Sequence, residues 1–185
     1  AHRRAARARD YFFRAIDYLR PPPPVLVAVG GLSGSGKSRL AREIAPYLGA
    51  APGARVVRTD VQRKRLAGIG LLDRLPPESY TPEASANTYA ACHDEARAAL
   101  KAGQSVVFDA VSARAEERVG IEALANEMQV PFLGLWVDAP LAVRLERVES
   151  RKNNVSDAGA EVARRQEDMD IGEIGWTVSL VKPDV

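Results

Sequence analysis

Short apolar runs alternate along the chain with stretches in which apolar residues recur every three or four positions. A run of four to eight apolar residues predicts a buried strand, and a recurrence of about 3.6 residues predicts a helix. The runs cover residues 25–29, 55–59, 105–108, 131–137 and 176–181, and helical patterns cover 37–48, 61–67, 83–101, 114–128, 140–151 and 158–170. Strands that alternate with helices predict an α/β fold, in which a parallel sheet is covered by helices on both faces.

The first 24 residues have a different pattern. Residues 3–20 carry many arginines, and Phe12, Ile16 and Leu19 share one face of the helix expected there. Residues 21–24 are all proline, which forbids a helix and favours an extended linker. We therefore expect an N-terminal helix and polyproline linker at 1–24, followed by one domain at 25–185. The helix could dock on this domain or connect it to an absent upstream domain.

Composition and charge are those of an ordinary globular protein, with 46% hydrophobic and 27% charged residues. A net charge of +2 is too small to indicate nucleic acid or a membrane surface, and an arginine-rich helix is more often a solvated face than a nucleic-acid contact. No apolar run approaches the length of a membrane span. The single cysteine, Cys92, excludes an internal disulfide and suits a reducing compartment, so we expect a cytoplasmic protein.

A glycine-rich turn follows the apolar run at 25–29 and matches the phosphate-loop spacing G-x-x-x-x-G-K-[ST]. Glycines let several backbone N–H groups point inward at phosphate oxygens, and the N-terminus of the next helix adds partial positive charge. In such a loop the lysine reaches the β- and γ-phosphates, and the final hydroxyl ligates Mg²⁺. The expected nucleotide-binding residues are Gly31, Leu32, Ser33, Gly34, Ser35, Gly36, Lys37 and Ser38.

Two carboxylates follow predicted strands. Ligands of open parallel sheets bind beyond the carboxyl ends of the strands, so these side chains should meet the phosphate loop at one edge. Asp109 follows the apolar run 105–108 and is the expected second magnesium ligand, with a turn or helix cap as the alternative. Asp60 ends the run at 55–59 and is the expected general base. Arg63, one turn later, could hold an anionic acceptor or orient Asp60, unless both are simply a cap and a surface residue.

Three arginines share one face of the helix expected at 140–151. Arg144, Arg147 and Arg151 are spaced i, i+3 and i+7, and a polar stretch follows them. This pattern predicts a lid that closes cations over the γ-phosphate during transfer. A solvated basic face is the alternative interpretation.

Aromatic residues lie between the two carboxylates in the sequence. Tyr80 precedes the helix expected at 83–101, and Tyr89 and His93 are one turn apart within it. These side chains could line an acceptor pocket or pack in the core, and packing is the commoner role for a histidine such as His93.

Taken together, these motifs resemble those of phosphate-loop kinases of the AAA-type, zeta-toxin-like group. The chain is most similar to the ATP-binding C-terminal half of bacterial two-part proteins whose N-terminal half resembles an aminoglycoside phosphotransferase. The residues that carry the resemblance lie at 30–38, 58–61, 63–66, 80–82, 88–89, 107–111, Arg118, Arg144, Arg151, 156–158, Gln166 and 172–176. The resemblance implies a three-layer phosphate-loop NTPase fold with five parallel strands in the order 2-3-1-4-5. It also implies ATP and Mg²⁺ as cofactors, and it adds Arg118 to the acceptor side of the site.

The main hypothesis is an ATP-dependent kinase that transfers the γ-phosphoryl group to a hydroxyl of a small molecule. Lys37 neutralises phosphate charge, Ser38 and Asp109 hold Mg²⁺, and Asp60 accepts the hydroxyl proton. One alternative is an ATP-binding regulatory module that signals to an upstream phosphotransferase-like domain. Another is a nucleic-acid 5′-hydroxyl kinase, because Asp60 and Arg63 match a spacing found in polynucleotide kinases, although Thr59 separates Arg58 from Asp60.

Overall fold

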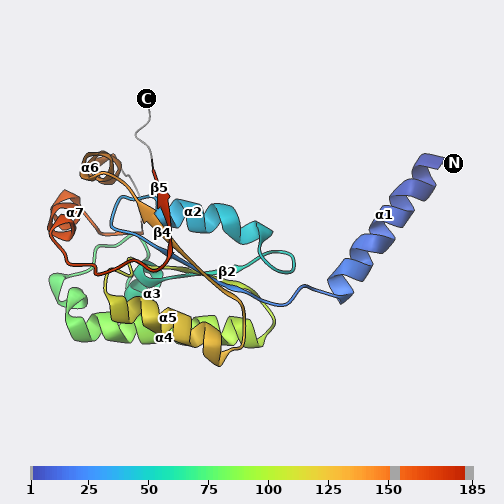
Figure 1. Cartoon of the computed structure of the whole chain (residues 1–185), viewed down its shortest axis with the longest axis horizontal. Helices are drawn as coiled ribbons and strands as arrows, with labels where there is room; N and C mark the ends of the chain where they lie inside the picture. The colour runs from blue at the N-terminus through green and yellow to red at the C-terminus, as the bar shows by residue number, and fades with distance from the viewer. Residues whose placement is uncertain (1, 151–154, 182–185) are drawn as a thin grey trace.

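A single five-stranded parallel sheet forms the centre of the molecule (Figure 1). The computed structural model describes residues 2–150 and 155–181. Its strands are β1 (Leu26–Gly30), β2 (Arg55–Arg58), β3 (Val106–Asp109), β4 (Phe132–Asp138) and β5 (Thr177–Leu180). They lie in the order β2-β3-β1-β4-β5, which confirms both the predicted α/β class and the predicted strand order.

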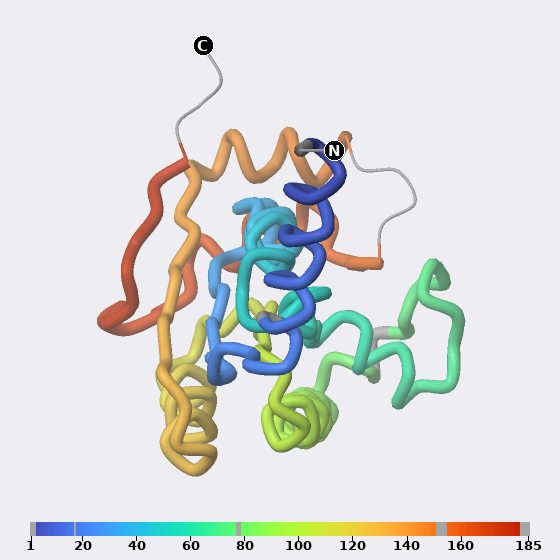
Figure 2. The backbone as a smooth tube through the Cα atoms, turned by 90° about the vertical axis from the view of Figure 1, so that its right-hand side faces the viewer, coloured from blue at the N-terminus to red at the C-terminus, as the bar shows by residue number. Residues whose placement is uncertain are grey.

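Helices cover both faces of this sheet. They are α2 (Lys37–Ile44), α3 (Thr59–Leu66), α4 (Pro82–Lys101), α5 (Ala115–Glu127), α6 (Leu141–Glu149) and α7 (Ala160–Glu167), with 3₁₀ turns at Ala45–Tyr47 and Pro77–Tyr80. Helices α4 and α5 lie side by side on one face, and α2 lies on the other (Figures 1 and 2). Most of these helices begin or end within three residues of the predicted bounds, because capping and loop contacts set the ends.

Burial on both faces explains the unbroken apolar run of β1. Leu26 and Ala28 point into the core formed with α4 and α5, whereas Val27 and Val29 point into the core formed with α2. All four side chains are at most 4% exposed, so none of these positions can be polar without leaving an unsatisfied group in the core.

The register of the sheet brings the strand ends together at one edge. Asp109, the last residue of β3, pairs with Arg58 of β2 on one side and with Val29 of β1 on the other. The chain leaves β1 into the phosphate loop at the same edge, because all five strands run in one direction. The sheet therefore presents the loop and the residues after β2 and β3 to a common space.

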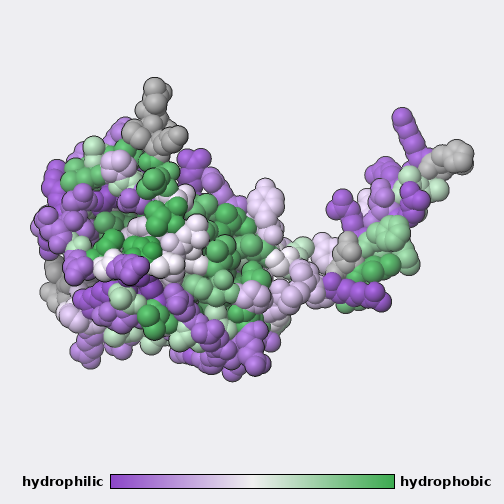
Figure 3. All heavy atoms as spheres, in the orientation of Figure 1, coloured by the Kyte–Doolittle hydropathy of each residue, from purple (hydrophilic) through white to green (hydrophobic). Residues whose placement is uncertain are grey.

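The N-terminal helix α1 (His2–Leu19) stands away from the sheet domain (Figure 1). Its aromatic side chains are exposed, with Tyr11 at 67% and Phe12 at 64%. Figure 3 shows hydrophobic residues gathered together on this helix. The docked arrangement of this helix is therefore not found, and its role as a connection to an upstream domain stays a prediction. Among the described helices, none combines the length and apolar character needed to span a membrane.

Candidate active site

The phosphate loop is shaped by glycines that no other residue could replace. Gly34 has a φ of +89°, and a Cβ added there would lie 2.8 Å from the Cα of Arg144, so the backbone of α6 packs directly against the loop. Gly36 has a φ of +105° and forms the N-cap of α2. Within the described residues, the N–H groups of Gly34, Gly36, Lys37 and Ser38 donate no backbone hydrogen bond. They form the donor cluster that a phosphate chain requires at a helix N-terminus.

Side chains from α6 and α7 hold this loop from outside. Arg147 on α6 donates from Nη1 to the backbone oxygen of Ser35 at 3.0 Å. Gln166 on α7 accepts through Oε1 from the backbone N–H of Ser33 at 2.8 Å. The two contacts fix opposite ends of the tight turn, and they bring two helices distant in sequence onto the nucleotide-binding loop.

Arg144 connects α6 to α7 instead of facing the nucleotide. Its side chain is 1% exposed, donates to the backbone oxygen of Ala163 at 3.4 Å and forms an ion pair with Glu167. The predicted lid required Arg144 and Arg147 to turn toward the γ-phosphate, and in this structure both donate to protein groups. The third arginine of the predicted lid, Arg151, lies outside the described residues.

A cavity of about 640 Å³ opens in front of the phosphate loop at the carboxyl edge of the sheet. Among its lining residues are Ser33 and Lys37 of the loop, Asp60 and Arg63 of α3, Asp109 of β3, and Tyr80 and Tyr89. The predicted base, two residues of the loop and three residues predicted for the acceptor side are thus brought together in one space with Asp109. Arg118, Arg144 and Arg147 do not line this cavity, and Ser38 lies beside Lys37 in the first turn of α2.

Asp109 is buried at the base of the cavity with one oxygen available. Its Oδ2 accepts from Nε of Arg58 at 2.9 Å, and the two side chains are 2% and 14% exposed. Its Oδ1 is buried and has no hydrogen-bond partner among the described residues. A free carboxylate oxygen beside a phosphate site fits Mg²⁺, which keeps several waters and takes one or two protein ligands together with substrate phosphates. Asp109 and Ser38 therefore supply a donor set that fits this ion.

Asp60 lies in the first turn of α3, which begins at Thr59 and not at residue 61 as predicted. Thr59 is 8% exposed and continues the chain straight from β2 into the helix. The positive end of the helix dipole favours a carboxylate at this place. Within the described residues, the Asp60 side chain accepts no hydrogen bond and forms no ion pair, so it is available to a ligand in the cavity.

Arg63, one turn after Asp60, holds the turn that precedes α4. Its Nη1 donates to the backbone oxygen of Ser79 at 2.7 Å, and its guanidinium carbon lies 5.1 Å from the centre of the Tyr80 ring. Arg63 thereby joins α3 to the wall of the cavity that carries Tyr80. Arg63 also lines the cavity.

Lys64, next to Arg63, is a buried residue to which the sequence assigned no role. Its side chain is 1% exposed. The ammonium group donates to the backbone oxygens of Leu71 and Asp73, at 3.0 and 2.7 Å, and to Oδ1 of Asp157 at 3.0 Å. A buried ammonium with three acceptors is fully satisfied, so this position stabilises two loops that are more than 80 residues apart.

Asp157 accepts hydrogen bonds from three segments and completes what we call the polar clamp (Lys64, Leu75, Tyr80 and Asp157). Besides Lys64, the backbone N–H of Leu75 donates to its Oδ2 at 3.1 Å and the Tyr80 hydroxyl donates at 3.0 Å. Burial acts to raise the pKa of Asp157, but the hydrogen bonds from Lys64, Leu75 and Tyr80 outweigh it and hold this pKa below its usual value. Burial and the bond to Asp157 raise the pKa of Tyr80.

Tyr89 forms a fixed part of the cavity wall. Its hydroxyl accepts from the backbone N–H of Ser112 at 3.1 Å, and its ring stacks on Phe108 with centroids 6.3 Å apart. Burial, followed by the nearby Glu117 carboxylate, raises the pKa of Tyr89, so the hydroxyl stays protonated. Ser112 has a φ of +50°, an uncommon value that is typical of strained loops at functional sites.

Arg118 has a place different from the predicted acceptor role. Its side chain is 4% exposed. Nη1 donates to the backbone oxygens of Ser112 and Ala113 at 2.9 and 2.8 Å, and Nη2 donates to those of Ile171 and Glu173 at 2.7 and 3.1 Å. Four carbonyl partners make Arg118 a support beneath the loop after β3, and Arg118 itself is not among the residues that line the cavity.

Sequence reasoning also left Gln166 and Asp157 without roles, although both belong to the motifs that carry the family resemblance. The only local signal for Lys64 is its spacing of four residues from Asp60, which places it on the same side of α3. No local pattern relates Lys64 to a carboxylate 93 positions later.

Comparison with known sequences places the chain in a family. The model of the AAA_33 family, described as an AAA domain, matches residues 26–169. An uncharacterised protein of Mycobacterium tuberculosis strain H37Rv, Rv2004c, is 31% identical over 176 residues, which cover 91% of this chain and 34% of the relative. An adenylyl-sulfate kinase of Myxococcus xanthus is 32% identical over 118 residues, which cover 63% of this chain and 59% of that enzyme. The chain spans about a third of the length of its mycobacterial relatives.

Comparison with solved structures gives the same fold. The APS kinase CysC of Mycobacterium tuberculosis, solved in complex with AMPPNP and APS, superposes with a TM-score of 0.55 at 25% identity and covers 70% of each chain. This match supports a shared fold. The sheet topology and the structural match show that the chain has the phosphate-loop fold of kinases. The family match shows that the chain belongs to the AAA_33 family of AAA domains.

Proposed function

We propose that this domain transfers the γ-phosphoryl group of ATP to a hydroxyl of a small-molecule acceptor. The observation that carries the proposal is the common cavity of Lys37, Asp60 and Asp109 at the carboxyl edge of the sheet. Phosphoryl transfer needs phosphate binding, charge neutralisation and a base for the attacking hydroxyl, and these three groups can supply each of them. Positioning and electrostatics dominate this reaction, so little further chemistry is required of the protein.

The phosphate loop and Lys37 would bind the phosphates. The free N–H groups of the loop and the N-terminus of α2 would cradle the β-phosphate, and the Lys37 ammonium would reach the β- and γ-phosphates. Ser38 and the free Oδ1 of Asp109 would hold the magnesium ion, with Arg58 fixing the orientation of the Asp109 carboxylate. Bound there, the ion would neutralise charge on the phosphates.

Asp60 would act as the general base. Its carboxylate would accept the proton of the acceptor hydroxyl as the hydroxyl oxygen bonds to the γ-phosphorus and the bond to the β,γ-bridging oxygen breaks. The products are ADP and a phosphate monoester. Arg63, which borders the same cavity, would orient the acceptor or an anionic group on it.

Arg144, Arg147 and Gln166 would position the loop instead of touching the transferred group. In this proposal α6 and α7 act as a frame for the phosphate loop. We keep the role that the sequence predicts for Arg151, which is to close over the γ-phosphate during transfer.

The similar proteins support this reaction class. The Myxococcus xanthus relative is an adenylyl-sulfate kinase, and the CysC structure holds an ATP analogue together with APS. Both therefore support ATP as the donor and a small molecule as the acceptor. The acceptor of this chain is not fixed by the fold, because the same scaffold serves many substrates.

A second candidate function is a regulatory ATP-binding module. The observation that favours it is the length of the mycobacterial relatives, of which this chain spans about a third. Such a module would bind ATP and signal to a neighbouring domain, which the sequence resemblance suggests is phosphotransferase-like. The exposed aromatic side chains of α1 could contact that domain.

One experiment separates the two functions. A library of hydroxyl compounds, including sugars, sugar acids, nucleosides and an oligonucleotide with a free 5′-hydroxyl, is screened for stimulation of ADP formation. A kinase gives at least one compound that stimulates ADP formation in the natural chain and not in Lys37→Ala. A regulatory module binds ATP equally well but gives no stimulated turnover with any compound.

A further inference from the structure

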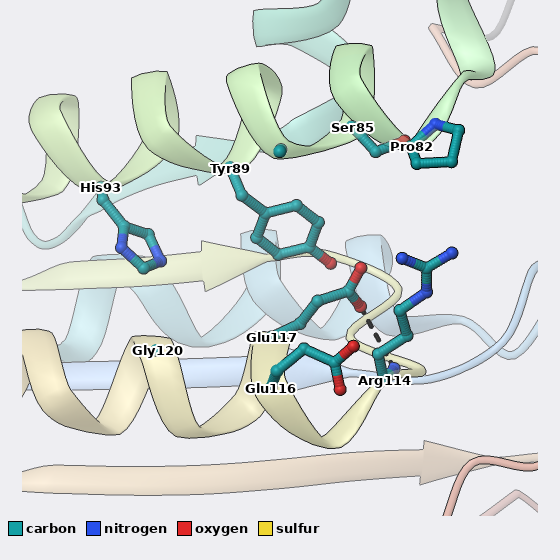
Figure 4. A pocket seen from close by; sticks show the side chains of 9 residues that line it. Pro82, Ser85, Tyr89, His93, Arg114, Glu116, Glu117 and Gly120 are labelled. Atoms are coloured by element: carbon teal, nitrogen blue, oxygen red, sulfur yellow. Dashed lines mark hydrogen bonds between the residues drawn. The ribbon is translucent and has the colours of Figure 1, made fainter.

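A second, smaller cavity of about 210 Å³ lies between α4 and α5 (Figure 4). Ser85, Tyr89, Arg114 and Glu117 line both this groove and the large cavity, so the two spaces share a wall. Figure 4 shows Arg114 at one end of the groove, and His93 at the other end. The groove therefore extends the proposed acceptor site away from the phosphate loop.

Aromatic packing fixes the shape of the groove. The rings of Tyr89 and His93 both rest on Phe108, a core residue, with centroid distances of 6.3 and 5.5 Å. The Tyr89 hydroxyl is also held by the backbone N–H of Ser112. Because these contacts are made within the protein itself, an occupant would find a preorganised surface and would order few side chains on binding.

Gly120 keeps the groove open. A Cβ at this position of α5 would lie 3.2 Å from Cε1 of His93, which is closer than ordinary van der Waals contact. Glycine is unfavourable inside a helix, so its presence here needs a reason beyond helix formation. The missing side chain is what leaves space between α5 and the imidazole.

His93 is the polar group at the inner end of the groove. Its Nε2 is buried and has no hydrogen-bond partner among the described residues. Burial and the neighbouring Arg97 lower the pKa of His93, so the imidazole is neutral at neutral pH and can donate or accept one hydrogen bond. An occupant with a hydroxyl or amide group could supply the missing partner.

We propose that the groove is an acceptor subsite that takes an uncharged planar ring joined to the part of the acceptor that is phosphorylated. The inference rests on the proposed kinase function, because it treats the large cavity as the place of the reacting hydroxyl. The planar ring suits the flat aromatic wall of Tyr89, and Arg114 and Glu117 at the entrance suit a polar link between ring and hydroxyl. The groove would thus select elongated acceptors over compact ones.

Phenol is the first probe of the groove, and the imidazole of His93 is the reporter. The chain has two histidines, so His2→Gln leaves His93 as the sole imidazole signal in a ¹⁵N–¹H NMR titration. Phenol should shift the His93 resonances saturably. In Gly120→Ala, made in the same background, the affinity for phenol should fall at least about tenfold, because the added methyl narrows the groove.

Gly175→Ala is the matched control, since a Cβ there meets nothing within 4 Å, and its affinity for phenol should be unchanged. Alanine favours a helix over glycine, so thermal unfolding should show Gly120→Ala to be folded. If phenol gives no saturable shift of His93, or binds Gly120→Ala as tightly as the control, the groove proposal is overturned.

Kinetics connect the groove to the acceptor. With the first acceptor found by the screen, phenol should raise the acceptor KM and leave the KM for ATP unchanged. Phenol that binds at His93 without changing the acceptor KM would overturn the assignment as an acceptor subsite. Phenol binding in a protein that no hydroxyl compound stimulates would instead contradict the proposed kinase function, so the two failures are distinguishable.

Discussion

The two ends of the cavity are built in different ways. The phosphate end is a contiguous stretch of chain between β1 and α2, whose shape follows from glycines packed against backbone, as at Gly34 and Arg144. The proposed acceptor end is built from segments far apart in the sequence, joined by the polar clamp (Lys64, Leu75, Tyr80 and Asp157). One end depends on local conformation, and the other depends on buried polar contacts.

This difference suggests how the two ends can change independently. A phosphate loop tolerates little substitution, because a Cβ at Gly31 or Gly34 would lie 2.4 Å from a backbone oxygen and a bulky side chain would block the phosphates. A clamp of side chains can hold loops of various length and sequence, provided that the buried charges remain paired. The acceptor side of this fold is therefore the side on which new substrates can be accommodated.

The largest effect is expected at the phosphate end. Gly34→Ala should lower the free energy of unfolding by about 4 kcal/mol, because it adds both a left-handed backbone penalty and an overpacked contact with Arg144. Gly103→Ala is the matched control, since Gly103 also has a positive φ, +79°, but open space around its Cβ. The free energy of unfolding of Gly103→Ala, measured in urea, should fall by only about 1–2 kcal/mol. Equal losses in the two variants would show that the contact with α6 contributes nothing.

A smaller loss is expected when the clamp loses its cation. Lys64→Met keeps the length of the side chain but leaves Asp157 and two backbone oxygens without their donor, so the free energy of unfolding should fall by about 3 kcal/mol. Arg165→Met, which breaks the exposed ion pair with Glu161, should cost less than about 0.5 kcal/mol. A loss at Lys64 no greater than that at Arg165 would contradict the clamp.

The smallest effect is the pH dependence of Asp157. Its folded pKa lies below the unfolded value, so its contribution is present above the unfolded pKa and disappears as pH falls through the folded pKa. Near neutral pH, Asp157→Asn should be about 2 kcal/mol less stable than the natural chain. This difference in the free energy of unfolding between Asp157→Asn and the natural chain should become smaller when urea unfolding is repeated between about pH 5 and pH 3. A difference that stays constant over this range would mean that the carboxylate charge is not stabilising.

The sequence predicts the phosphate end well because its determinants are local. The apolar run of β1, the glycine spacing and Lys37 lie within fourteen consecutive residues, 25–38. The position of Asp109 at the loop edge follows from parallel topology, because the carboxyl ends of parallel strands meet at one edge. The strand order, by contrast, is implied by the family resemblance and not by the pattern of strands and helices. The sequence correctly predicts that Asp60 lies at the carboxyl edge of the sheet, and the structure adds that this residue lies in a helix.

The arginines show what periodicity cannot predict. The spacing of Arg144 and Arg147 correctly places them on neighbouring positions of one helix, but it says nothing of what that helix faces. In the structure they face α7 and the loop backbone, and both find acceptors there. Arg118 and Lys64 are similar cases, since a buried cation can be recognised only from its carbonyl and carboxylate partners elsewhere in the chain.

In the proposed mechanism Asp60 faces the phosphate site and serves the acceptor, not the nucleotide. The turnover of Asp60→Asn with an acceptor from the screen, measured together with its affinity for MgATP, tests this role. We expect kcat to fall by about 10²–10⁴-fold while the Kd for MgATP stays within about twofold of the natural value. An unchanged kcat, or a loss of MgATP affinity that matches the loss of turnover, would contradict it.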